Sequence, residues 1–209
     1  EDDVTLLTRP RRFGKTLMLD TIKTFFSPQF AGQSKLFENL EIWQDQQFHT
    51  LQGTIPVIFI SFASVKRNCF ADAVNAIKII IETCYNEFRY IVEKDSLLSA
   101  AEHKHFLLNN REMSDRDVIT SIYSLSEYIY RYHNKKPIIL IDEYDTPFLE
   151  AWSKGYWDEI IDFMRPFFNT TFKTNPWLER GLLTGITRIS KESIFSDLNN
   201  LAVVSTTSD

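Results

Sequence analysis

Two short segments of this sequence carry residue types that could bind phosphate and a divalent metal. The first is the RPRRFGKT segment (residues 9–16), whose last three residues match the end of the phosphate-binding pattern G-x-x-x-x-G-K-[ST]. In that pattern, Gly14 lets the backbone approach a phosphate without a Cβ in the way. Lys15 would reach the β and γ phosphates as a point charge, and the Thr16 hydroxyl would ligate Mg²⁺. The segment therefore predicts a nucleotide-binding loop.

The RPRRFGKT segment departs from the pattern at its first position. Arg9 stands where the pattern has glycine, beside the stiff Pro10, so a residue with a side chain must make the bend. Residues 4–7 are a short apolar strand and residues 17–26 an amphipathic helix, so the loop amides would lie at a helix N-terminus, which favours anions. Because Gly-Lys-Thr also arises by chance, the alternative is a solvated basic turn that caps a helix.

The second segment is the apolar run 137–143, PIILIDE, which ends in two carboxylates. A run of β-branched residues without polar alternation is typical of a strand buried on both faces of a parallel sheet. The carboxyl ends of such strands are where open α/β sheets bind ligands. Asp142 could hold Mg²⁺, directly or through water, as a Walker B aspartate does, and Glu143 could orient or deprotonate an attacking water. The alternative, a solvated acidic turn, is disfavoured because both motifs follow strands in the expected order.

Three separated motifs together resemble the bacterial AAA-ATPase-like family, and the resemblance covers nearly the whole chain. They are RPRRFGKT at 9–16, LIDEYD at 140–145 and GITRISKESIFS at 185–196. The resemblance implies ATP and Mg²⁺ as ligands, ATP hydrolysis, and often a PD-(D/E)XK nuclease-like domain at the C-terminal end. In that family the arginine-rich loop without the first glycine is the usual form, so Arg9 does not indicate a dead site. Lys191 and Ser193 enter only through this resemblance.

Further site residues follow from the same motifs. Thr187 would be a polar sensor near the γ phosphate, or an ordinary strand-end threonine. Arg188 would stabilise transition-state charge in its own chain or in a neighbouring copy, and a surface salt bridge is the alternative. We expect one phosphate contact between Arg11 and Arg12, and for Asp145 a helix cap is favoured over a role in the metal shell. The predicted nucleotide-binding residues are Arg9, Arg11, Arg12, Phe13, Gly14, Lys15, Thr16 and Leu17, the metal ligands Thr16 and Asp142, and the catalytic residues Glu143, Thr187 and Arg188.

Alternating strands and helices are predicted to carry these residues. The expected strands are 4–7, 56–62, 137–141 and 181–186, and the expected helices are 17–26, 70–88, 118–132 and about 156–172. Ser114 with Asp117 predicts a capping box before the third helix, and Pro166 a kink in the fourth. A loop is expected after residue 147. Within the weakly patterned segment 94–113, His103-Lys104-His105 predicts a solvated loop rather than a metal site, because no third ligand is near.

This order predicts an α/β fold, a P-loop NTPase three-layer sandwich with a mainly parallel central sheet. We infer that the acidic strand lies next to the strand before the RPRRFGKT segment, in a topology with an extra strand between the two halves of the motif. The end of strand 181–186 would then also face the γ phosphate.

Length, net charge and cysteine content indicate what kind of protein this is. With 209 residues, the chain suits a single domain with residues 94–113 as an insert, and its two ends suggest a fragment of a longer protein. The formal net charge of −5 argues mildly against a general nucleic-acid binder and leaves direct nucleic-acid contact open. Cys69 and Cys84 suggest neither a disulfide framework nor zinc, and neither a signal peptide nor a membrane-length apolar run is seen. We therefore expect a cytoplasmic protein without membrane contact.

The combined interpretation is an ATPase that acts as a switch or motor for a partner domain. Two alternatives remain: a non-hydrolysing ATP-binding scaffold and a small-molecule kinase on the same fold. Glu143 argues against both, because a pure binder does not need this carboxylate and such kinases usually lack it. The absence of an N-K-x-D motif weakly favours ATP over GTP. A homo-oligomer would be required if Arg188 acted across a subunit boundary.

Overall fold

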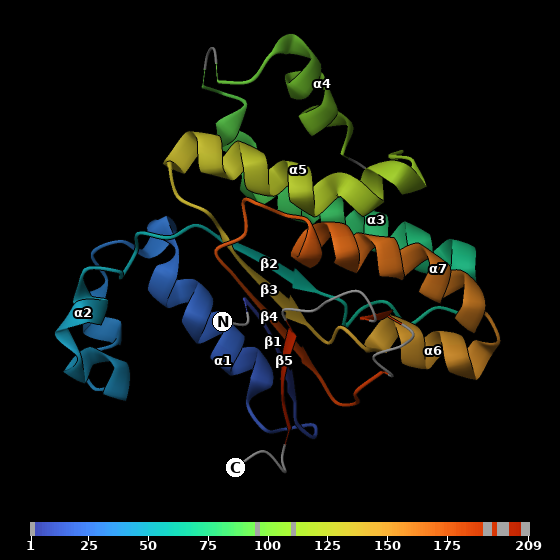
Figure 1. The fold of residues 1–209 in the computed structure, drawn as a ribbon, viewed down its shortest axis with the longest axis horizontal. Coiled ribbons are helices and arrows are strands. Elements are labelled where there is room, and N and C mark those ends of the chain that lie inside the picture. Colours follow the sequence, from blue (N-terminus) through green and yellow to red (C-terminus); the bar gives the residue numbers. More distant parts are fainter. Residues whose placement is uncertain (1–2, 95–96, 110–111, 190–193, 196–200, 206–209) are drawn as a thin grey trace.

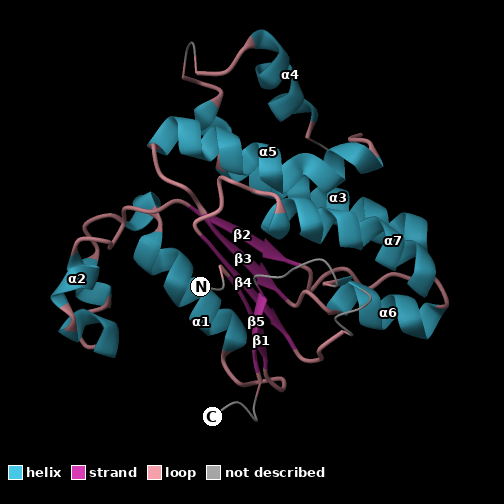
Figure 2. Ribbon diagram, in the orientation of Figure 1, coloured by secondary structure: helices cyan, strands magenta, loops and turns pink. Residues whose placement is uncertain are grey.

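The computed structural model describes residues 3–94, 97–109, 112–189, 194–195 and 201–205. This part of the chain forms a central sheet with helices on both faces (Figures 1 and 2). The strands are β1 (Val4–Thr8), β2 (Val57–Ser61), β3 (Ile138–Asp142), β4 (Arg180–Gly185) and β5 (Leu201–Val204). The helices are α1 (Lys15–Phe26), α2 (Gln46–His49), α3 (Phe70–Glu87), α4 (Ala100–Leu108), α5 (Asp115–His133), α6 (Thr146–Lys154) and α7 (Trp157–Phe168).

The five described strands are all parallel and lie in the order β2-β3-β4-β1-β5. This confirms the α/β class and the parallel sheet. The predicted adjacency of the acidic strand and the first strand is wrong, because β4 lies between β3 and β1. Leu182 of β4 pairs with Thr5 on one side and with Leu140 on the other. The crossover through α1 carries the chain to the far edge of the sheet, and β3 and β4 then fill the space back toward β1.

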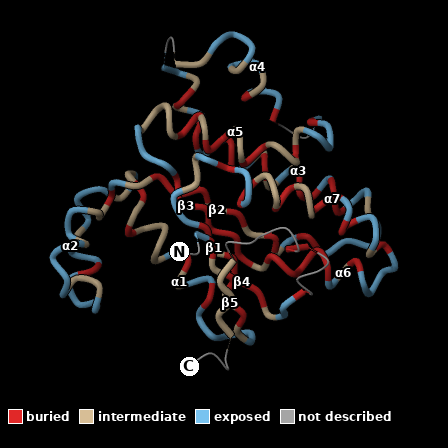
Figure 3. Tube along the Cα trace, in the orientation of Figure 1, coloured by how far each residue is buried: buried red, intermediate tan, exposed pale blue. Residues whose placement is uncertain are grey.

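The helices form two unequal layers over the sheet (Figure 1). Helix α1 covers one face, where Leu19 packs with Val57, Ile138 and Leu140 in a small cluster. Helices α3, α5 and α7 cover the other face and enclose most of the buried apolar side chains. Every residue of β3 is buried (Figure 3), as its unbroken apolar run predicts. Because the described strands are all parallel, their carboxyl ends meet at one edge of this sheet.

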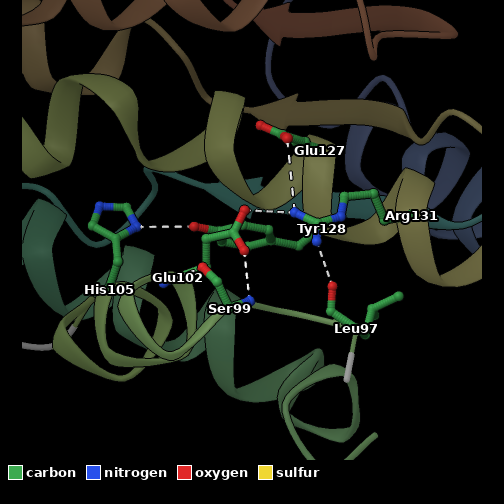
Figure 4. Close-up of polar contacts among 7 residues, drawn as sticks. All are labelled: Leu97, Ser99, Glu102, His105, Glu127, Tyr128 and Arg131. Atoms are coloured by element: carbon green, nitrogen blue, oxygen red, sulfur yellow. Dashed lines mark hydrogen bonds and ion pairs between the residues drawn. The ribbon is translucent and has the colours of Figure 1, made fainter. Parts of the chain in front are cut away.

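Helix α4 replaces the solvated loop that was expected around residues 103–105. Ser99 and Glu102 form a capping box at its start, and Glu102 also pairs with Arg131 of α5 (Figure 4). His105 contacts the Tyr128 hydroxyl at 3.2 Å. The sequence concealed this helix because its apolar residues show little helical periodicity. Among the described residues, no three His, Cys, Asp or Glu side chains gather as metal ligands.

The starts and ends of three other helices can be compared with the predictions. The capping box of Ser114 and Asp117 is confirmed at the start of α5. Helix α6 was missed, and the loop predicted after residue 147 is wrong: Pro147 lies in its first turn, where no amide donor is needed, and Gly155 ends it at φ 82°. The predicted helix 156–172 is divided into α7 and a π-helical turn, Asn169–Lys173, shortly after Pro166.

Two further findings concern the cysteines and the described helices. Cys69 and Cys84 are both free thiols. Across the described residues, no helix combines the length and apolar character that crossing a bilayer requires.

Candidate functional site

The RPRRFGKT segment joins β1 to α1 and leaves the N-terminus of α1 open. Gly14 is the N-cap residue at φ 72°, a conformation that favours glycine, and no side chain caps the helix. A Cβ on Gly14 would have no other atom within 4 Å, so its backbone angle and not crowding requires glycine. Arg12 also has a positive φ of 68°. The loop thus leaves the first amides of α1 without a capping side chain, a geometry suited to an anion.

Lys15 is held by the loop itself. Its Nζ donates to the carbonyl oxygens of Arg9, at 2.8 Å, and Pro10, at 2.9 Å, and the residue is only 9% exposed. The Arg9 amide donates to the carbonyl of Gly185 at 3.1 Å, and its guanidinium donates to the Thr8 carbonyl. The bend at Arg9 is therefore anchored to β4 through the backbone, which explains how a residue with a side chain can occupy the position of the expected glycine.

Asp142 lies at the centre of the polar contacts between the two motifs. Its Oδ2 accepts from the Thr16 hydroxyl at 2.7 Å, and its Oδ1 accepts from the Thr184 hydroxyl at 2.6 Å and from the Glu143 amide at 3.0 Å. The carboxylate is buried, with 2% of Asp142 exposed. Hydroxyl and carboxylate oxygens in contact are a ligand set that suits Mg²⁺. Sequence reasoning missed Thr184, because only the pairing of β3 with β4 brings it beside Asp142.

Glu143 has an unusual backbone conformation, with φ 49°. Such left-handed residues other than glycine cost on the order of 1–3 kcal/mol and cluster at functional sites. Its Oε2 accepts from the Thr146 hydroxyl at 3.0 Å, which holds the carboxylate in one orientation. Thr146 was not predicted as a site residue, although it follows Glu143 by three positions at the start of α6.

A cavity of about 320 Å³ lies where the two motifs meet. It is lined by Arg11, Arg12, Gly14, Lys15, Thr16, Leu17, Glu143 and Ile186. Its volume is in the range of small-ligand sites. Three cationic side chains face one carboxylate there, so the lining favours an anionic ligand. Leu17 is 70% exposed at this cavity, whereas Phe13, 66% exposed, and Arg9 do not line it.

The predicted residues at the end of β4 lie beside this cavity rather than in its wall. Thr187 and Arg188 are exposed and follow Ile186, which lines the cavity. Asp145 occupies the N-cap position of α6 but does not cap it, so that prediction is wrong. Its carboxylate accepts instead from the amides of Ile186 and Thr187, and burial raises its pKa. Lys191 and Ser193 lie outside the described residues.

Comparison with known proteins relates this chain to a protein family and to a curated protein. The family model AAA-ATPase_like, described as "Predicted AAA-ATPase", matches residues 1–195. An uncharacterized protein in the vnfD 5′ region of Azotobacter chroococcum mcd 1 is 29% identical over 206 residues. The alignment includes 95% of this chain and 33% of that protein. The chain thus spans about a third of the length of this curated relative.

Proposed function

The chain belongs to the AAA-ATPase-like family, and we propose that it binds ATP with Mg²⁺ and hydrolyses the bond between the β and γ phosphates, releasing ADP and phosphate. The observation that carries the proposal is the 2.7 Å hydrogen bond between Thr16 and Asp142. It joins the hydroxyl after the loop lysine to the carboxylate at the end of a buried strand, and these are the two groups that hold the metal in P-loop NTPases.

Phosphate binding would rest on the positive side of the cavity. The Lys15 ammonium now keeps two carbonyl partners and would exchange them for β and γ phosphate oxygens. The amides at the start of α1 would donate to the same anion. Arg11 and Arg12 line the cavity and would add charge-assisted hydrogen bonds to the phosphates.

The metal ligands would be Thr16 and Asp142, whose oxygens already lie in contact. When bound there, Mg²⁺ supplies positive charge to the β and γ phosphate oxygens. Thr184 and the Glu143 amide would keep Oδ1 of Asp142 oriented while Oδ2 is available on the side of Thr16. Oδ1 of Asp142 would thus keep its hydrogen bonds within the protein, and Oδ2 would bind Mg²⁺.

Glu143 would orient and deprotonate the attacking water. Its carboxylate lines the cavity, and the Thr146 hydroxyl fixes one of its oxygens. Because the Glu143 side chain is already oriented, it can act as a general base without first being immobilised in the reaction step. Thr187 and Arg188 would contribute a sensor and a charge-stabilising group from the neighbouring strand end.

The use of this activity in a longer protein is a further part of the proposal. We propose that nucleotide state drives a switch or motor step in a partner domain of a longer, cytoplasmic protein, and that this partner is nuclease-like, as in the family resemblance. ATP is favoured over GTP because the sequence has no N-K-x-D motif. Direct contact with nucleic acid forms no part of this proposal.

The decisive experiment compares wild type with Glu143→Gln in the full-length protein. Both proteins should bind ATP and Mg²⁺ with similar affinity, because Lys15, Thr16 and Asp142 are unchanged. Single-turnover phosphate release should fall by about 10²–10⁴-fold in the variant, the usual contribution of a general base. Glu150→Gln, a change on α6, is the matched control and should retain the wild-type rate. If wild type releases phosphate no faster than Glu143→Gln at equal occupancy, the protein is a non-hydrolysing ATP-binding scaffold.

A further inference from the structure

The carboxylate of Asp145 is fully buried and holds two consecutive backbone amides. Its Oδ2 accepts from the amide of Ile186 at 2.9 Å and from that of Thr187 at 2.7 Å. These amides belong to the turn that leaves β4, which we name the β4 turn (residues 186–189). Asp145 itself lies at the end of the acidic motif. The contact therefore links the carboxyl end of β3 to the backbone that carries Thr187 and Arg188.

Tyr144 holds the same turn from its other end. Its hydroxyl donates to the carbonyl of Thr187 at 2.9 Å and accepts from the amide of Ile189 at 3.1 Å. The ring is fully buried and packs against Phe195, with the ring centroids 5.5 Å apart. Two adjacent side chains thus make four hydrogen bonds to the β4 turn.

Gly185 leaves no room for a side chain between β4 and the side chains of Tyr144 and Asp145. A Cβ built on Gly185 would lie 2.6 Å from Cε1 of Tyr144 and 2.8 Å from Oδ1 of Asp145. Such distances are far inside van der Waals contact, so β4 approaches Tyr144 and Asp145 as closely as its backbone allows. A packed interface of this kind transmits small displacements, because it cannot deform gradually.

The β4 turn is also continuous with the cavity. Ile186 lines it together with Glu143, which precedes Tyr144 in the chain. One residue before Gly185, Thr184 donates to Asp142 at 2.6 Å. The four residues Asp142 to Asp145 therefore divide their tasks by position: the first two face the ligand site, and the next two face the β4 turn.

We propose that Tyr144 and Asp145 are positioning residues for the reaction: they hold the β4 turn so that Thr187 and Arg188 stand at the reacting end of the site. This inference rests on the proposed ATPase function and adds to it. Positioning of this kind should affect turnover more than ground-state binding, because the hydrogen bonds described for Lys15, Thr16 and Asp142 do not involve the β4 turn. A misplacement of about 1 Å can cost on the order of 10²-fold in rate.

The main test is Tyr144→Phe in the full-length protein, since it removes the hydroxyl and keeps the ring packing. Tyr156→Phe is the matched control: Tyr156 is buried too, and its hydroxyl donates to the Arg67 carbonyl at 2.9 Å, outside the site. We expect Tyr144→Phe to lower single-turnover phosphate release by about 10–10²-fold. ATP affinity should change less than about twofold, and hydrogen exchange of the 186–189 amides should rise. The control should change neither rate nor exchange at the β4 turn.

A pair of substitutions at Asp145 supplies the second test. Asp145→Asn keeps an acceptor oxygen for both amides and should retain most of the turnover, whereas Asp145→Ala should lose it and raise exchange at the β4 turn. Because Asp145→Ala removes, at a buried position, the acceptor of the Ile186 and Thr187 amides, its thermal unfolding is measured first, and Tyr144→Phe decides if it does not fold.

The outcomes separate the two proposals. If wild type hydrolyses ATP and Tyr144→Phe matches it at equal occupancy, the positioning role is overturned and the ATPase function stands. If affinity and turnover fall together, the two residues serve ligand binding or folding and the positioning role is again overturned. If wild type itself releases no phosphate above Glu143→Gln, the ATPase function fails, and the positioning role fails with it.

Discussion

The Thr16 hydroxyl and the Asp142 carboxylate meet at 2.7 Å although 126 positions separate them in the sequence. The strands that lead to them, β1 and β3, are not neighbours, and the contact passes the end of the intervening β4. Thr184 of β4 donates to the other oxygen of Asp142 at 2.6 Å. The carboxylate therefore joins the ends of β3 and β4 to the start of α1, and its charge should govern the response to Mg²⁺.

Asp142→Asn should weaken the effect of Mg²⁺ on ATP affinity by at least about tenfold. The amide keeps the shape of the side chain but loses the negative charge that a hard divalent cation prefers. Calorimetric titration of ATP with Mg²⁺ and with a chelator measures the effect. Asp20→Asn, a change of an exposed carboxylate on α1, serves as control. An identical Mg²⁺ response in wild type and Asp142→Asn would remove Asp142 from the metal shell.

Lys15→Ala should lower ATP affinity at least about tenfold while the protein remains folded. Hydrogen bonds to charged groups contribute about 1.5–3 kcal/mol, and the partners of Lys15 are loop carbonyls rather than core groups. Lys23→Ala on the same helix removes an ion pair with Glu87 and should leave affinity unchanged. Calorimetry together with thermal unfolding checks both variants. A folded Lys15→Ala protein with wild-type affinity would contradict the phosphate-binding assignment.

Arg188→Ala should slow hydrolysis with little effect on binding, because Arg188 is exposed beside the cavity and does not line it. Arginine fingers contribute on the order of 10³–10⁵-fold in rate. Mixing Arg188→Ala with Glu143→Gln separates two arrangements, and light scattering establishes that the variants associate. Recovery of turnover in the mixture means that Arg188 acts on a neighbouring subunit. Without recovery at any ratio, Arg188 acts in its own chain, and an unchanged rate in Arg188→Ala alone excludes both.

Glu102→Gln should remove a contribution to stability that wild type loses when the pH falls into the acid range. Hydrogen bonds from Ser99, and then from Arg131, lower the pKa of Glu102 from 4.5 to about 2 (Figure 4). Its folded-state pKa is depressed, so its contribution to stability is present above about pH 4.5 and is lost as the pH falls toward 2. The difference in melting temperature between wild type and Glu102→Gln should therefore shrink over that range. Glu127→Gln, which removes a carboxylate 3.9 Å from the same Arg131, is the control. A difference that stays constant from pH 6 to pH 2 would contradict this account.

The sequence predicted those elements whose own residues determine them. The unbroken apolar run of β3 is typical of a buried strand, and the capping box at Ser114 marked the start of α5. Helices α4 and α6 were missed for two different reasons. The former is polar and is held by an ion pair to Arg131, which no local pattern reveals. The latter begins with Thr146-Pro147, a pair that also suits a turn.

The site was predicted as two motifs but not as an assembly. Sequence spacing indicated the residue types of Lys15, Thr16, Asp142 and Glu143, because the chemistry of phosphate and metal limits the choice. The order of strands depends on tertiary packing, so the neighbours of Asp142 could not be predicted. The hydrogen bond from Thr184 to Asp142 and those from the β4 turn to Asp145 form only when β4 lies beside β3.

The place of β1 in the sheet has a consequence for biosynthesis. Of the described strands it is synthesised first, yet both of its partners, β4 and β5, come from the last fifth of the described sequence. At a synthesis rate of about 5–20 residues per second, β1 and the RPRRFGKT segment wait on the order of ten seconds or more for a partner. During this interval α3, α5 and β3 can already pack on β2. The ribosome-bound chain therefore exposes an apolar strand and a cationic loop, which makes it a candidate for chaperone capture until β4 emerges.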